Sequence, residues 1–121
     1  VESHEAIEAF AAELIDRFGP LPEEVRHLLD ILEIKGLCRQ AGIEQIDAGP
    51  KGAVIAFRNK SFANPEGLIA FIREEGNRVK LQPDHRLIYY ANWETQEARL
   101  SGTRDLLKRL VKIAQAVKQA A

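Results

Sequence analysis

Apolar residues recur at helical spacing in two segments at the start of the chain. In residues 4–18 the apolar side chains lie three or four positions apart and are expected to face the core: Ile7, Phe10, Leu14 and Phe18. Residues 23–40 carry a broad apolar face, with Ile31 and Leu37 at its margins, made by Val25, Leu28, Leu29, Leu32 and Cys38. This period predicts two amphipathic helices.

A stiff corner is predicted between these helices. Gly19 and Pro20 end the first one, because glycine suits a left-handed cap and proline cannot continue the hydrogen bonding of a helix. Pro22 suits the first turn of the next helix, where its missing N–H is not needed. Glu23 and Glu24 follow, where negative charge meets the positive end of the helix dipole.

Two β-hairpins are predicted further along the chain. Residues 43–48 and 53–58 flank the turn Gly49-Pro50-Lys51-Gly52, and residues 79–82 and 86–91 flank Pro83-Asp84-His85. Each hairpin is followed by a helix. The two N-terminal helices and two hairpin–helix units predict an α+β fold, with a small, largely antiparallel sheet packed against helices. The pattern leaves open whether the hairpins join edge to edge.

The helix after the first hairpin begins at Asn64-Pro65, packs inward through Leu68, Ile69, Phe71 and Ile72, and ends at Gly76. The last helix is clear from Thr103, and its inward side chains are expected to be Leu107, Leu110, Val111, Ala114 and Val117. Gly102 leaves its start open between residues 94 and 102, because a glycine inside a helix costs roughly 1 kcal/mol.

The composition fits one ordinary domain over residues 1–121, with 45% hydrophobic and 29% charged residues. The apolar runs are too short for a membrane span. Cys38 is the single cysteine, so no internal disulfide forms and a reducing cytoplasm is expected. The chain begins with Val1 and has no methionine. We therefore expect it to be a segment of a longer protein.

The net charge of −1 hides an asymmetry. Acidic residues dominate residues 1–33, and basic residues dominate residues 99–121. Solvated or mutually paired helices are one interpretation, and an acidic docking face for a basic partner is the other. Glu13 and Asp16 project together because they lie three positions apart on a helix. No His, Cys or third carboxylate is placed to complete a metal or acid–base site, which favours an exposed acidic face.

The remaining motifs predict binding and not catalysis. Lys51-Gly52 has neither the spacing nor the following helix of a phosphate loop. No nucleophile with a base and no cofactor motif is present, so the chain is predicted to be a non-enzymatic binding or regulatory module without a cofactor. Arg104, Lys108 and Lys112 form a basic stripe on the last helix, and contact with nucleic acid or RNA polymerase is the alternative that it suggests. A small-molecule sensor on the sheet is a third.

The run E-L-I-D-R-F-G-P-L-P at residues 13–22 resembles the C-terminal domain of bacterial transcription-repair coupling factors, the Mfd family. The likeness continues through residues 51–57, Asn64-Pro65 and residues 86–90. It implies a parent protein that is an ATP-driven DNA translocase, displaces stalled RNA polymerase and recruits excision repair through UvrA. The C-terminal domain of that family is expected to pack on the N-terminal UvrB-homology module and to mask the UvrA-binding surface, so that UvrA competes indirectly. Glu13 and Asp16 match the acidic residues that make this contact.

Overall fold

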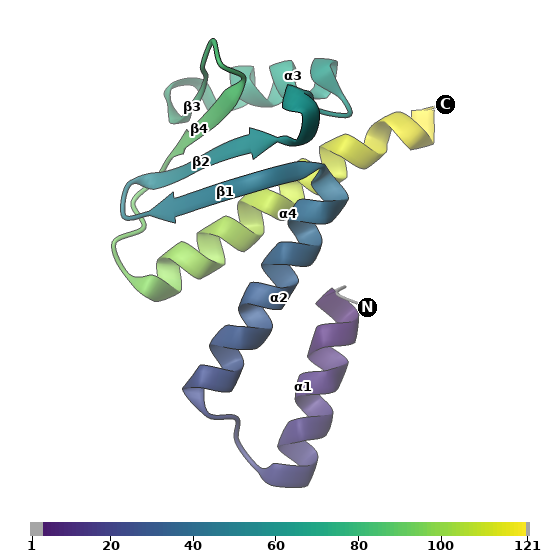
Figure 1. Cartoon of the computed structure of the whole chain (residues 1–121), viewed down its shortest axis with the longest axis vertical. Coiled ribbons are helices and arrows are strands. Elements are labelled where there is room, and N and C mark those ends of the chain that lie inside the picture. The colour runs from purple at the N-terminus through teal and green to yellow at the C-terminus, as the bar shows by residue number, and fades with distance from the viewer. Residues whose placement is uncertain (1–3, 121) are drawn as a thin grey trace.

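The computed structural model describes the backbone of residues 4–120 and the side chains of residues 5–116. Two helices open the chain, α1 (His4–Phe18) and α2 (Glu23–Ala41). The first hairpin, β1 (Ile43–Gly49) and β2 (Gly52–Phe57), leads through η1 (Arg58–Lys60) to α3 (Pro65–Glu75). The second unit comprises η2 (Gly76–Arg78), β3 (Val79–Leu81), β4 (Arg86–Tyr90) and α4 (Gln96–Ala120). The predicted α+β fold is confirmed (Figure 1).

The two hairpins form one antiparallel sheet with strand order β1-β2-β4-β3. β2 and β4 join them, with Val54 opposite Ile88 and Ile55 opposite Leu87. Successive side chains alternate between the faces of the sheet. Ile55 and Leu87 therefore share the inner face and are fully buried, whereas Val54 and Ile88 share the outer face and are half-buried.

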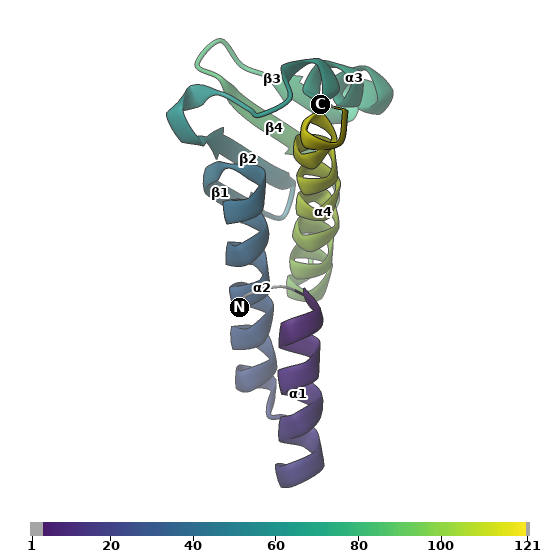
Figure 2. The same cartoon turned by 90° about the vertical axis from the view of Figure 1, so that its right-hand side faces the viewer.

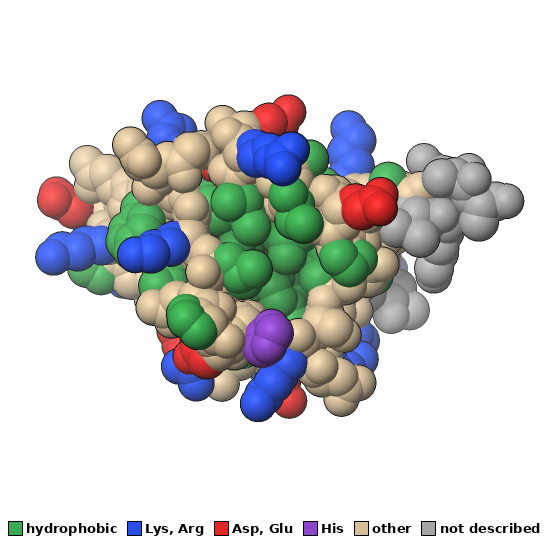
Figure 3. Space-filling view, turned by 90° about the horizontal axis from the view of Figure 1, so that it is seen from above, with side chains coloured by type: hydrophobic (Ala, Val, Ile, Leu, Met, Phe, Trp, Pro, Cys, Tyr) green, Lys and Arg blue, Asp and Glu red, His purple; other side chains and the backbone are tan. Residues whose placement is uncertain are grey.

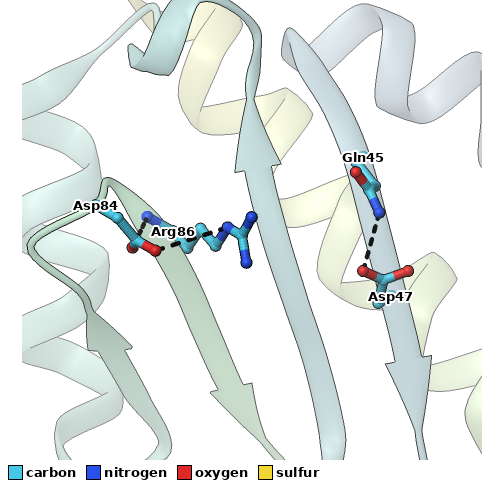
Figure 4. A network of polar contacts seen from close by, with 4 residues as sticks. All are labelled: Gln45, Asp47, Asp84 and Arg86. Carbon is cyan, nitrogen blue, oxygen red and sulfur yellow. Dashed lines mark hydrogen bonds and ion pairs between the residues drawn. The ribbon is translucent and has the colours of Figure 1, made fainter.

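The core lies between the inner face of the sheet and the helices α3 and α4 (Figure 2). Its fully buried centre comprises Ile55, Leu87, Leu107 and Leu110. On β1 the outer face carries a polar pair, in which Gln45 Nε2 donates to Asp47 Oδ2 at 3.1 Å. In the β3–β4 turn, Asp84 Oδ2 lies 3.7 Å from Arg86 Nε at the start of β4 (Figure 4).

α1 and α2 form a helical hairpin that extends beyond the sheet (Figures 1 and 2). Ile7, Ala11 and Leu29 are buried between the two helices. The prediction that Phe10, Leu14 and Phe18 face the core is wrong, since Phe10 is 53% exposed, Phe18 is 78% exposed and Leu14 is only half-buried. α1 has α2 as its main neighbour, and a single neighbour covers only a narrow stripe of a helix.

α2 also buries a different face from the predicted one. Its buried residues are Leu29, Glu33, Gly36, Leu37 and Ala41. The expected face included Leu28 and Leu32, which are exposed, and placed Leu37 at a margin. α4 packs along α2 on the flank that carries Glu33. Leu28, Ile31 and Leu32 therefore remain on the flank that α4 does not cover. Cys38 packs against the core as expected, and Gly42 caps the helix with φ 71°.

Side-chain caps set the starts of α3 and α4. Asn64 Oδ1 accepts a hydrogen bond from the Gly67 N–H at 3.0 Å, which confirms the predicted cap. Leu68 and Phe71 are buried as expected, but Ile69 is 50% exposed and faces away from the core. α4 starts early and includes Gly102, with Thr95 Oγ1 accepting from the Ala98 N–H at 3.0 Å. Leu107, Leu110, Val111 and Ala114 are buried as predicted, and the side chain of Val117 lies outside the described part.

Candidate functional site

The acidic pair Glu13 and Asp16 lies on the exposed side of α1. Glu13 Oε1 is 3.0 Å from Arg17 Nη2, one helical turn further on, and both side chains are more than half exposed. Asp16 lies about 140° around the helix from Ala11, which packs against α2. The structure thus brings the two predicted carboxylates together on a face that no other described element covers.

An exposed apolar patch lies beside this pair, and we call it the hairpin patch. Its members and their exposed fractions are Phe10 53%, Leu28 59%, Ile31 44% and Leu32 39%. Leu28, Ile31 and Leu32 lie three and four positions apart, so they form one stripe along α2. Helical geometry places Phe10 at the same level and on the same flank of the antiparallel pair. Phe10 also precedes Glu13 by three positions, so the patch adjoins the acidic pair.

Acidic side chains lie at the end of the hairpin patch near the α1–α2 connection, where Glu13 follows Phe10 by three positions and Glu24 precedes Leu28 by four. At the other end of the patch the exposed Lys35 follows Ile31 by four positions. The acidic side chains of α1 and the first turn of α2 are exposed: Glu5, Glu8, Glu13, Asp16, Glu23 and Glu24. The basic residues of the same segment are Arg17 and Arg26, and Arg17 is already paired with Glu13. The helical hairpin therefore presents an apolar centre with a polar rim that is acidic at one end, which matches the usual anatomy of a protein–protein interface.

The basic stripe of α4 divides into two parts. Arg104 lies against α2, with its Nε 3.7 Å from Glu33 Oε1 and its Nη1 3.9 Å from Asp30 Oδ1. Because the Glu33 side chain is only 2% exposed, a guanidinium beside it offsets part of the cost of burying its charge. Lys108 and Lys112 are exposed and remain available to a partner.

The Lys51-Gly52 pair occupies a tight strand connection, as the turn interpretation predicted. Gly52 has φ 131°, and a Cβ there would lie 1.9 Å from the Tyr89 carbonyl oxygen. The Lys51 carbonyl accepts a hydrogen bond from the Ala91 N–H at 2.9 Å. The glycine is thus required by close strand packing.

A hollow of about 420 Å³ lies beside this turn, bordered by Val54, Ile88 and Tyr90 on the outer face of the sheet.

The described residues contain no group of three metal-ligating side chains close enough to hold an ion. His27 Nε2 lies 3.9 Å from Glu23 Oε1 on the surface of α2, and His85 lies in the β3–β4 turn. Burial raises the pKa of the Cys38 thiol, which makes it a poor nucleophile at neutral pH. Across the described helices, none has the length and apolar character needed to cross a membrane.

Comparison with known proteins identifies the class. Residues 1–68 match the TRCF domain model, and the chain therefore belongs to the TRCF domain family. It is 42% identical over 83 residues to a transcription-repair-coupling factor of Rickettsia conorii, a match that covers 69% of this chain and 7% of that protein. It is 32% identical over 104 residues to the transcription-repair-coupling factor of Escherichia coli, covering 86% of this chain and 9% of that protein. The chain thus spans less than a tenth of these relatives, and the resemblance seen in the sequence is confirmed.

Sequence reasoning missed two features of the site. Glu33 lies midway between Leu29 and Leu37, at spacings of four, so its position in an otherwise apolar row could have indicated burial. No such signal in the sequence indicated that Leu28, Ile31 and Leu32 are exposed. Their apolar character is equally consistent with a core face and with an exposed patch, and only the position of α4 decides between these alternatives.

Proposed function

We propose that this chain is a non-catalytic regulatory domain that packs through its α1–α2 hairpin on the UvrB-homology module of its parent protein and masks the surface that binds UvrA. The observation that carries the proposal is the exposed pair Glu13 and Asp16 beside an uncovered apolar patch. The pair lies in the segment that matches the TRCF domain model. The acidic end of this surface suits a partner surface with basic side chains.

The two parts of the surface would contribute differently. Exposed ion pairs made by Glu13 and Asp16 are each worth under about 1 kcal/mol and weaken with salt. Buried aromatic and aliphatic side chains such as Phe10 and Leu28 supply most of the affinity of an interface. Two modules of one polypeptide also meet at a high effective concentration, so a modest interface suffices. Such a contact opens when the motor engages its substrates, as a switch requires.

The rest of the proposal concerns the parent protein. Relatives of this chain are transcription-repair-coupling factors, and we infer that the parent is an ATP-driven DNA translocase that displaces stalled RNA polymerase. Contacts with DNA and RNA polymerase would then lie in the rest of the parent, and UvrA would compete indirectly with this domain. A cytoplasmic location fits that role.

Binding between this domain and the separately expressed UvrB-homology module of the same protein tests the proposal. Wild-type affinity should fall with salt, and Glu13→Lys/Asp16→Lys should weaken it by roughly tenfold or more. Phe10→Ser/Leu28→Ser should weaken it at every salt concentration, because it removes apolar burial. Glu44→Lys/Glu74→Lys is the matched control, since both residues are exposed on other elements. Equal loss in the control, or no loss in either interface variant, would sink the assignment.

A second candidate function is a nucleic-acid or RNA polymerase contact through α4, favoured by the exposure of Lys108 and Lys112. Neutralising both should reduce the slope of log DNA affinity against log salt concentration by about two, one for each lost phosphate contact. An unchanged slope would exclude DNA as the partner of this stripe.

A further inference from the structure

A second apolar surface lies at the opposite end of the molecule from the α1–α2 hairpin, and we call it the α3 groove (Figure 3). One wall is the stripe Pro65, Leu68, Ile69 and Ile72 of α3. Leu81 of β3 lies on the other wall, and Lys60 and His85 lie at its edge. The groove is thus built by residues 57–72, which run from the end of β2 into α3, and by residues 81–85 of the second hairpin.

The groove combines a rigid floor with exposed walls. Phe57 and Phe62 are buried, and their ring centroids lie 5.2 Å apart. Ile69 and Leu81, by contrast, are 50% and 44% exposed. Large apolar side chains gathered over a packed floor are typical of a surface that receives a partner.

The dimensions favour side chains over a small molecule. The groove has a volume of about 250 Å³, which is below the range of roughly 300–1,000 Å³ found for small-ligand sites. Pro65, Leu68, Ile69 and Ile72 lie at positions i, i+3, i+4 and i+7, so their stripe extends about 10 Å along α3. A helix of about two turns presents side chains over the same length, as in helix-in-groove recognition.

Lys60 is the lysine that lines the groove, and it lies at the edge. Arg58 and Arg73 are close to the lining residues in the sequence, whereas Lys80 and Arg86 belong to the outer face of the sheet, paired with Ile88 and Ala56. The acidic residues of the segment 57–86 are Glu66, Glu74, Glu75 and Asp84. Glu75 is paired with Arg109 of α4, and Asp84 lies beside Arg86. Figure 3 shows Lys and Arg side chains at several places around the apolar area and Asp or Glu side chains at others, and Lys60 in the lining itself favours an acidic partner.

The backbone around the groove is unusual as well. Within residues 4–120, the non-glycine residues with positive φ are Asn59 (56°), Lys60 (56°) and His85 (69°). Lys60 and His85 line the groove, and Asn59 precedes Lys60. Left-handed backbone at such residues is unfavourable and concentrates at binding sites. Here it fixes the backbone of Lys60 and His85 at the edge of the groove.

We propose that the α3 groove binds an acidic amphipathic helix of a separate protein, with apolar side chains at i, i+3 or i+4, and i+7 in the groove and carboxylates facing Lys60. This site is independent of the α1–α2 hairpin, and the two surfaces can be occupied at the same time. Failure of either proposal therefore leaves the other intact.

A display library of helical peptides tests the proposal, with glutamate fixed on the flanks and Leu, Ile, Val, Phe or Met at the apolar positions. Selected peptides should shift the amide NMR signals of α3, β3 and the β3–β4 turn. Ile69→Ser and Lys60→Glu should each weaken binding by roughly tenfold. Tyr90→Ser and Lys51→Glu are the controls, because they change an exposed apolar residue and an exposed lysine outside the groove. Their affinity should equal that of the wild-type domain.

Two results would overturn the assignment of the groove as the binding site. One is a library that yields no binder with a dissociation constant below about 1 mM, a threshold that even weak peptide contacts reach. The other is a set of selected peptides that shift signals of the α1–α2 hairpin, or that bind Ile69→Ser as tightly as the wild-type domain. Peptides in which lysine replaces the flanking glutamates should bind more weakly, and equal binding would contradict the acidic partner.

Discussion

The indole of Trp93 lies against the backbone of Gly102, so closely that a Cβ at residue 102 would be 2.2 Å from Trp93 Nε1. Trp93 is 6% exposed and belongs to the main core cluster. This contact explains why a glycine stands inside α4, where helix propensity alone disfavours it. Since α4 begins at Gln96, residue 102 lies inside the helix and against Trp93, and this packing requires the small residue.

Gly102→Ala should therefore destabilise the domain by about 1–3 kcal/mol, the usual range for overpacking. Helix propensity alone predicts the opposite sign, a gain of roughly 1 kcal/mol. The control is Ser101→Ala at the neighbouring exposed position, which should be neutral or slightly stabilising. Urea unfolding of the three proteins decides between the two signs, and a more stable Gly102→Ala would contradict the packing account.

The contact between Glu33 and Arg104 predicts a strong coupling between α2 and α4. Arg104→Met removes a cationic neighbour of a buried carboxylate and should destabilise the domain by about 1–3 kcal/mol. The double variant Glu33→Leu/Arg104→Met should recover most of that loss, because an apolar pair needs no charge compensation. Additive effects in this double-mutant cycle would show that the two side chains act independently.

Asn64 connects α3 to α4 and should be sensitive to its side-chain chemistry. Its Nδ2 donates to the Ile113 carbonyl at 3.0 Å, while its Oδ1 caps α3. Asn64→Ala should lower the free energy of unfolding by about 1–2 kcal/mol. Asn64→Asp keeps the cap but loses the donor, so its loss should be smaller. If thermal unfolding shows equal losses of stability for Asn64→Ala and Asn64→Asp, the whole effect belongs to the hydrogen bond with the Ile113 carbonyl.

Cys38 should react slowly with thiol reagents in the folded domain. Burial raises the pKa of its thiol above the ordinary value of 9.0. A raised pKa means that the folded state holds the proton more tightly, so this contribution to stability is complete below about pH 9 and is lost as pH rises above it. The stability difference between wild type and Cys38→Ala should accordingly shrink between pH 8 and pH 10, measured by urea unfolding. A constant difference would contradict the burial effect.

Local signals were enough to predict the elements and their order. Gly42, Asn64 and Gly76 lie where caps were expected, and both hairpins form around the predicted turns. These features depend on a few neighbouring residues, so their physics is readable from the sequence.

Burial on α1 and α2 could not be predicted in the same way. Phe10 and Leu28 have the spacing of core residues, yet they are exposed because α4 packs on the other flank of α2. Which apolar stripe is covered depends on contacts between elements far apart in the chain. The acidic pair Glu13 and Asp16 was predicted to be exposed, as it is. The apolar patch that completes the candidate interface became visible only in the fold.

Binding of UvrA to the full-length parent protein tests the central claim most directly. If the α1–α2 hairpin holds the UvrB-homology module closed, Glu13→Lys/Asp16→Lys should raise the affinity for UvrA by roughly tenfold or more. The control Glu44→Lys/Glu74→Lys should bind UvrA like the wild type, and urea unfolding should show that both double variants remain folded. An unchanged UvrA affinity in the Glu13/Asp16 variant would contradict the account, because the hairpin would then not mask that surface.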